Sequence, residues 1–152
     1  MSFEERLKSL NIILPSAPNP VGAYVAYKVI NKFIYISGQL PIDKGVLIKG
    51  KIGRDISIEK GKEAAKMCCV NILSQLKTAC EGNLDNVKNC IKITGFVNST
   101  DDFIEQPSII NPASELLTNI FGQNGKHTRA AVSVNSLPLG ACVEIDAIFE
   151  IN

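Results

Sequence analysis

The sequence predicts an α+β fold: one mostly antiparallel sheet with helices on one face. Strand-like runs stand near both ends of the chain, at 23–40 and 128–151, and are rich in β-branched and aromatic residues or alternate apolar with polar side chains. Between them, segment 57–80 places apolar residues at helical spacing. A chain of 152 residues that is 45% hydrophobic is long enough to form one domain, residues 1–152, with a substantial core.

Composition excludes several classes of function. A net charge of +1 gives no basic surface for nucleic acid, and no apolar run approaches the roughly 20 residues of a membrane span. The first ten residues lack the basic and then apolar blocks of a secretory signal, so the five cysteines are expected to be reduced thiols in a cytoplasmic protein. With no C-x-x-C pair and a single histidine, His127, no zinc site is expected.

The N-terminal part, residues 1–22, is expected to form a short helix and an extended connector. Ser2 and Glu5 fit a capping box for a helix over about 3–9. The following segment, 14–22, reads LPSAPNPVG, and its three prolines forbid a helix and favour an extended path.

Two strands follow the connector, at 23–30 and 32–40, with a tight turn at residues 31–32. Gly38 lies inside or at the end of the second strand. A glycine there marks either a β-bulge or a close approach of the backbone to a ligand, and both interpretations stay open.

A loop over 41–56, with a small ribbon at 46–52, leads to the long helix at 57–80. Ser57 is its N-cap candidate and Gly82 lies beyond its end. Its apolar stripe consists of Ala65, Cys68, Cys69, Ile72, Leu76, Ala79 and Cys80. We expect this stripe to pack on the sheet, with its cysteines acting as small buried hydrophobes.

A third strand is expected at 87–98, where both faces are apolar enough for a central position in the sheet. After a loop at 99–103, a second main helix is expected over 112–121. Asn111 is its N-cap candidate and Pro112 its first residue.

The last two strands, 128–134 and 143–151, flank a turn at 137–140 and are expected to pair as a hairpin. One face of that hairpin would carry four side chains: Arg129, Ala131, Glu144 and Asp146. Opposed positions lie about 5 Å apart, so Arg129 and Glu144 would be held close together on a rigid frame. Such a guanidinium can grip a ligand carboxylate, or it can form an ordinary cross-strand salt bridge.

Several motifs over residues 15–152 together resemble the Rid family, also called the YjgF or L-PSP endoribonuclease-like family. Residues 20–41, PVGAYVAYKVINKFIYISGQLP, look like its Gly-Pro-Tyr-like triplet followed by Ser-Gly-Gln, with Ala23 in place of the usual proline. Ile110-Asn111 resembles the Val-Asn that opens the last helix of the family, and 128–150 resembles its C-terminal signature of Arg, Leu-Pro and Val-Glu-Ile. Segment 96–117 looks closer to a longer, YjgF-like subfamily.

The resemblance implies a chorismate-mutase-like fold and a homotrimer in which three sheets form a central barrel, with clefts between neighbouring subunits. An open sheet face that carries apolar residues agrees with a partner subunit. In the deaminating branch of the family, the substrates are enamines and imines such as 2-aminoacrylate and 2-iminobutyrate. These are hydrolysed to 2-oxo acids and ammonia without a cofactor.

Residues of the family site match this sequence position by position. Arg129 matches the arginine that holds the substrate carboxylate, and Glu144 matches the acid that positions or activates water. Three residues match positions that line the cleft: Tyr24, Gly38 and Asn111. Ala131 stands where many deaminating members have cysteine, and its backbone N–H could serve the carboxylate instead.

Three classes of function stay open at this point. The first is a Rid-type deaminase, and the second is a non-catalytic trimer that binds a small carboxylate metabolite. The third, an endoribonuclease, is disfavoured because the charges balance and only one histidine is available for proton transfer. That histidine, His127, would share the face of Arg129 if the strand extends so far, and we expect it to be a loop or rim residue.

Overall fold

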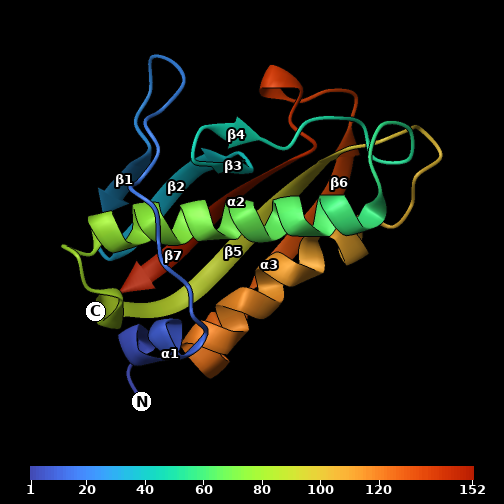
Figure 1. Ribbon diagram of the computed structural model, residues 1–152. Helices are drawn as coiled ribbons and strands as arrows, with labels where there is room; N and C mark the ends of the chain where they lie inside the picture. The colour runs from blue at the N-terminus through green and yellow to red at the C-terminus, as the bar shows by residue number, and fades with distance from the viewer.

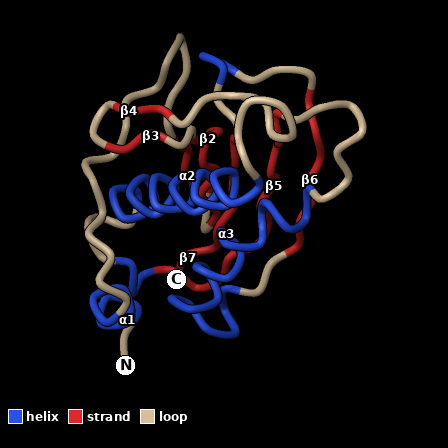
Figure 2. The backbone as a smooth tube through the Cα atoms, turned by 45° about the vertical axis from the view of Figure 1, so that its right-hand side comes forward, coloured by secondary structure: helices blue, strands red, loops and turns tan.

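The structure, a computed structural model, describes residues 1–152. Its helices and strands are α1 (Phe3–Ser9), β1 (Tyr27–Ile30), β2 (Phe33–Gln39), β3 (Ile42–Asp43), β4 (Val46–Leu47), α2 (Ile58–Ala79), β5 (Val87–Asn98), α3 (Gln106–Phe121), β6 (Thr128–Val134) and β7 (Val143–Ile151). The main sheet has the order β1-β2-β7-β5-β6, and only β5 and β6 run parallel. Helices α2 and α3 lie side by side over one face, which confirms the predicted α+β class (Figures 1 and 2). The helices are all too short or too polar to span a bilayer.

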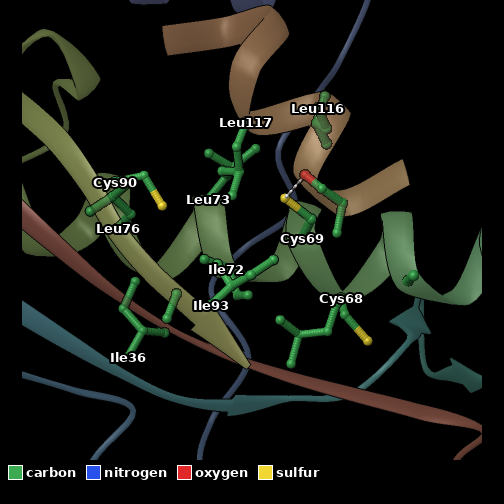
Figure 3. Close-up of a cluster of buried hydrophobic side chains, with 14 of the residues drawn as sticks. Ile36, Cys68, Cys69, Ile72, Leu73, Leu76, Cys90, Ile93, Leu116 and Leu117 are labelled. Atoms are coloured by element: carbon green, nitrogen blue, oxygen red, sulfur yellow. Dashed lines mark hydrogen bonds between the residues drawn. The ribbon is translucent and has the colours of Figure 1, made fainter. Parts of the chain in front are cut away.

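The hydrophobic core lies between the sheet and the two long helices. It contains 29 buried residues, among them Leu73, Ile93 and Leu117, which meet from α2, β5 and α3 (Figure 3). The five cysteines are buried free thiols, as expected for the three on the stripe of α2. The Sγ atom of Cys69 lies 3.5 Å from the carbonyl oxygen of Ala113, which ties α2 to α3 within this core.

Local capping and turn signals are confirmed. Ser2 and Glu5 form the reciprocal capping box of α1, and the Ser57 hydroxyl accepts the Lys60 backbone N–H at the start of α2. The two-residue turn between β1 and β2 places Asn31 at φ 54°, a left-handed conformation that asparagine tolerates. The register between β2 and β7 shifts beside Gly38, so a β-bulge stands where the glycine predicted one.

The start of α3 was predicted wrongly. This helix begins at Gln106, so Pro112 lies in its interior and Asn111 is a helical residue rather than the N-cap. An interior proline costs about 3 kcal/mol, but extending the helix buries Ile109 and Ile110 completely, and each such side chain contributes about 1.5–3 kcal/mol. Burial therefore outweighs the proline. The small ribbon is also displaced: β3 and β4 span 42–47, not 46–52.

The predicted hairpin of the last two strands is also wrong. Strand β6 pairs in parallel with β5, and β7 lies between β2 and β5. The reason is burial, because the alternate residues of β7 that face the helices are almost completely inaccessible to solvent: Val143, Ile145, Ala147 and Phe149. A strand with such a face is best covered in the middle of the sheet, whereas the half-exposed β6 can occupy an edge.

This pairing separates two residues that the hairpin would have brought together. Arg129 lies opposite Ile93, whose side chain is buried beneath the helices, whereas Glu144 lies opposite Phe96. Because Ile93 and Phe96 are three positions apart on one strand, their side chains point to opposite faces. Arg129 is therefore on the helix face of the sheet, and Glu144 is on the other face, here called the open face.

The packing of α2 predicts that the thiols react slowly in the folded protein. Burial raises the pKa of Cys80 and of Cys142 to about 11, and the pKa of Cys90 to about 12. Since only a thiolate attacks, we expect labelling by a disulfide reagent at neutral pH to require unfolding. The five thiols should label at once in denaturant, which is the control. Fast labelling of Cys68, Cys69 or Cys80 in native protein would contradict this packing.

Candidate functional site

The residues predicted for the site lie in two places. Tyr24, Gly38 and Glu144 line one pocket of about 240 Å³, here called the Glu144 pocket. Arg129 and Asn111 are in contact elsewhere, between edge strand β6 and helix α3. Ala131 lies two residues beyond Arg129 on the same face of β6 and is half-buried. One chain therefore does not bring its candidate carboxylate and its candidate arginine together.

The Glu144 pocket lies where the proline-rich connector and the loop before β7 meet the end of β2. Ten further residues complete its lining: Pro18, Asn19, Pro20, Val21, Ala26, Gln39, Leu40, Ile42, Pro138 and Leu139. Leu139 has φ 59°, a left-handed conformation that is unfavourable for leucine, and its side chain is 60% exposed. The pocket thus has a mostly apolar wall with one carboxylate in it.

Gly38 allows the backbone of β2 to approach the Glu144 side chain. A Cβ atom at position 38 would overlap the Glu144 carboxylate, so no larger residue fits while that side chain keeps its place. The bulge and the close approach, which the sequence left as alternatives, are both present. The absence of a side chain at Gly38 therefore lets the Glu144 carboxylate pack directly against the backbone of β2.

The environment of Glu144 makes its carboxylate a better base. Partial burial raises the pKa of Glu144, and the neighbouring charge of Asp146 raises it further. The pKa of Asp146 is also raised, by burial, although hydrogen bonds from Thr94 oppose the change. A carboxyl group with a raised pKa in a pocket can take up and return a proton more readily near neutral pH.

Polar residues of α2 hold the wall of the Glu144 pocket from behind. The Asn71 side chain donates to the carbonyl oxygens of Leu40 (2.9 Å) and Ile42 (3.0 Å), and Gln75 donates to that of Pro18 (2.6 Å). Sequence reasoning missed this role. The available signal was the spacing of Asn71, Ser74 and Gln75, three buried polar residues on one side of an otherwise apolar helix.

The second group, here called the Arg129 cluster, consists of Asn111, Ser114, His127 and Arg129. The Nη1 atom of Arg129 donates to Asn111 Oδ1 (2.9 Å) and lies 3.2 Å from Ser114 Oγ. His127 lies in the loop before β6, as expected; it is half-buried and bonds to Ser114, so it is part of this cluster. None of the ion pairs of the chain includes Arg129 or Glu144, so the cross-strand salt bridge considered from sequence does not form.

The open face of the sheet carries large apolar side chains. Phe33 of β2, Tyr35 of β2 and Val132 of β6 are 39%, 47% and 44% exposed, and Phe96 is half-buried between Val132 and Glu144. Aromatic and branched side chains gathered on one solvent-facing surface are typical of an interface with another protein chain.

Comparisons with known proteins agree on one family. The family model described as "YjgF/chorismate mutase-like, putative endoribonuclease" matches residues 4–150. The chain is 41% identical over 148 residues to Protein TCP17 of Trypanosoma cruzi, covering 96% of this chain and 92% of that protein. It is 33% identical over 135 residues to the 2-iminobutanoate/2-iminopropanoate deaminase of Mus musculus, covering 87% and 84%. A crystal structure of a protein of unknown function from Agrobacterium tumefaciens superposes with a TM-score of 0.91 at 44% identity, covering 99% and 92%.

The contact between Gly38 and Glu144 predicts the effect of Gly38→Ala. The new methyl group would displace the carboxylate, which is the movable end of a flexible side chain, so the fold should survive. Once moved toward solvent, Glu144 should titrate closer to an ordinary glutamate, which carboxyl NMR would follow as a lowered pKa.

The matched control places Gly38→Ala in a Glu144→Ala background, where nothing is left to displace. There the methyl group should change the melting temperature by less than it does in the wild type. An unchanged titration of Glu144 in Gly38→Ala would contradict the contact.

Proposed function

Because the chain belongs to the Rid/YjgF family, we propose that it hydrolyses enamine and imine intermediates, such as 2-aminoacrylate or 2-iminobutyrate, to 2-oxo acids and ammonia. Relatives named 2-iminobutanoate/2-iminopropanoate deaminase support this activity. For this chain the proposal rests on the separation of Arg129 from Glu144, each without a charged partner. If the site needs both residues, one copy of the chain supplies Arg129 and a second copy supplies Glu144.

The proposed assembly is a homotrimer in which the open faces form a central barrel. The exposed apolar residues of the open face support such an arrangement, because a second copy would remove them from water. In a ring of three, each contact joins two different surfaces of the chain. One surface would bring the Arg129 cluster, and the other would bring the Glu144 pocket.

Arg129 is the proposed anchor for the substrate carboxylate. Its Nη1 atom is already engaged by acceptors on α3, and the remaining donors, on Nη2 and Nε, can form two parallel bonds to a carboxylate. Ala131 lies beside it on β6 and would offer its backbone N–H as a further donor. Asn111 keeps the guanidinium at the edge of the sheet, where a neighbouring copy could reach it.

Glu144 is the proposed proton-transfer group. Water adds to the carbon of the protonated imine as Glu144 takes a proton from that water, which gives a neutral amine and a hydroxyl group on the same carbon. Glu144 then returns the proton to the amine nitrogen. The C–N bond breaks as the hydroxyl group passes its proton to the Glu144 carboxylate, which forms the 2-oxo acid, and the departing ammonia takes that proton from Glu144 and leaves as ammonium. The raised pKa of Glu144 suits both halves of this exchange. The apolar wall of the pocket would hold the substrate side chain and limit access of bulk water.

Substitution of Arg129 tests the anchor. Losing a charged hydrogen bond costs about 1.5–3 kcal/mol, so Arg129→Ala should lower kcat/KM by about tenfold to a hundredfold. Arg129→Lys should recover only part of this, because an ammonium group lacks the two-pronged geometry. The assay adds purified protein to a dehydratase that generates 2-aminoacrylate and times the release of ammonia or pyruvate. Light scattering should give about three times the 16.5 kDa chain mass for each variant, which controls for assembly.

Glu144→Gln separates catalysis from binding. In a deaminase it should lower kcat by about a hundredfold or more, and binding of 2-oxobutyrate should change much less. In a protein that only binds a carboxylate, the wild type would accelerate nothing, and the affinity of Glu144→Gln would stay level or rise. If Arg129→Ala binds 2-oxobutyrate and processes imines as well as the wild type, the site lies elsewhere.

A further inference from the structure

The Arg129 cluster contains an unbroken series of hydrogen bonds that ends on buried backbone. Arg129 Nη1 lies 3.2 Å from Ser114 Oγ, Ser114 Oγ lies 2.9 Å from His127 Nε2, and His127 Nδ1 lies 2.6 Å from the carbonyl oxygen of Gly125. Gly125 is buried, and a Cβ atom there would overlap the backbone of Leu117 on α3. The end of the series is therefore anchored on a segment that packs closely against the helix.

The direction of every proton in this series follows from its last member. A carbonyl oxygen can only accept, so His127 Nδ1 must carry a hydrogen. In a neutral imidazole Nε2 is then the acceptor, and the Ser114 hydroxyl must donate to it. With its hydrogen turned toward His127, Ser114 presents its lone pairs to Arg129. In all three bonds the donor is then on the Arg129 side and the acceptor on the Gly125 side, and hydrogen bonds aligned in this way strengthen one another.

We propose that Ser114 and His127 are positioning residues that hold the Arg129 guanidinium ready for a carboxylate. This inference rests on the proposed function of Arg129. The two hydrogens of Nη1 meet Asn111 and Ser114, which leaves the Nε and Nη2 edge turned toward an incoming ligand. Arginine loses much rotamer freedom when it binds, and a guanidinium that is already fixed loses less at that moment.

The test combines Ser114→Ala with Arg129→Lys. Ser114→Ala should raise KM for the imine and Kd for 2-oxobutyrate about threefold to tenfold, with kcat little changed, because the carboxylate is held equally in substrate and transition state. In the Arg129→Lys background, Ser114→Ala should have almost no further effect, because the guanidinium that Ser114 orients is gone. Equal effects of Ser114→Ala in both backgrounds would show that the hydroxyl acts only on the fold and would overturn the proposal.

Thr118→Val is the matched control. Thr118 lies one turn further along α3, and its hydroxyl bonds only to its own helix, at the carbonyl of Glu115. Losing that hydroxyl should leave KM and Kd unchanged. If it raises KM as much as Ser114→Ala does, the effect belongs to the helix and the positioning role is wrong.

A readout without substrate separates this inference from the proposed activity. Nitrogen NMR of His127 should show the neutral tautomer with hydrogen on Nδ1, and the Nη1 hydrogens of Arg129 should be slow to exchange in the wild type and faster in Ser114→Ala. If the wild type neither binds 2-oxobutyrate nor hydrolyses imines but both signals behave this way, the proposed function fails and the hydrogen-bond series stands. The other tautomer, or an Arg129 signal indifferent to Ser114, would overturn the series itself.

Discussion

The structure depends on the burial of β7 in the middle of the sheet. Its helix-facing residues fill the space under α2 and α3, and a strand so placed needs a neighbour on each side. Strand β2 takes one side and β5 the other, which leaves β6 at the edge. This one constraint sets Glu144 on the open face against the bulge at Gly38, and it sets Arg129 on the opposite face against α3.

The separation of charge follows from that arrangement. Arg129 and Glu144 each keep polar or backbone neighbours that orient them, but neither has an opposite charge within the chain. An arginine that neutralised its own glutamate would have little left for a ligand. The proposed site, shared between two copies, would avoid this, because the cation and the base would meet only across a contact between chains. Burial of the apolar open face would favour such a contact.

The sequence predicted most elements but not the pairing of the last strands. Caps at Ser2 and Ser57, the turn at Asn31 and the bulge at Gly38 are local signals, and each was correct. Alternation along 128–134 and 143–151 shows which side chains share a face of each strand, but it does not specify which other strand each one pairs with. The better signal was the order strand, helix, strand over 87–134, which favours a parallel pair joined by a crossover helix. The Arg129 cluster could not be predicted, because it depends on where α3 crosses β6.

Subunit mixing tests the shared site most directly. Chains carrying Arg129→Ala and chains carrying Glu144→Gln are unfolded together in equal amounts, refolded and assayed. Each variant alone should be nearly inactive, but in random mixed trimers about a quarter of the sites would combine an intact Arg129 from one chain with an intact Glu144 from its neighbour. If the site is shared between copies, the mixture should regain about this fraction of wild-type activity. A mixture no more active than the average of its two components would contradict a site formed between copies.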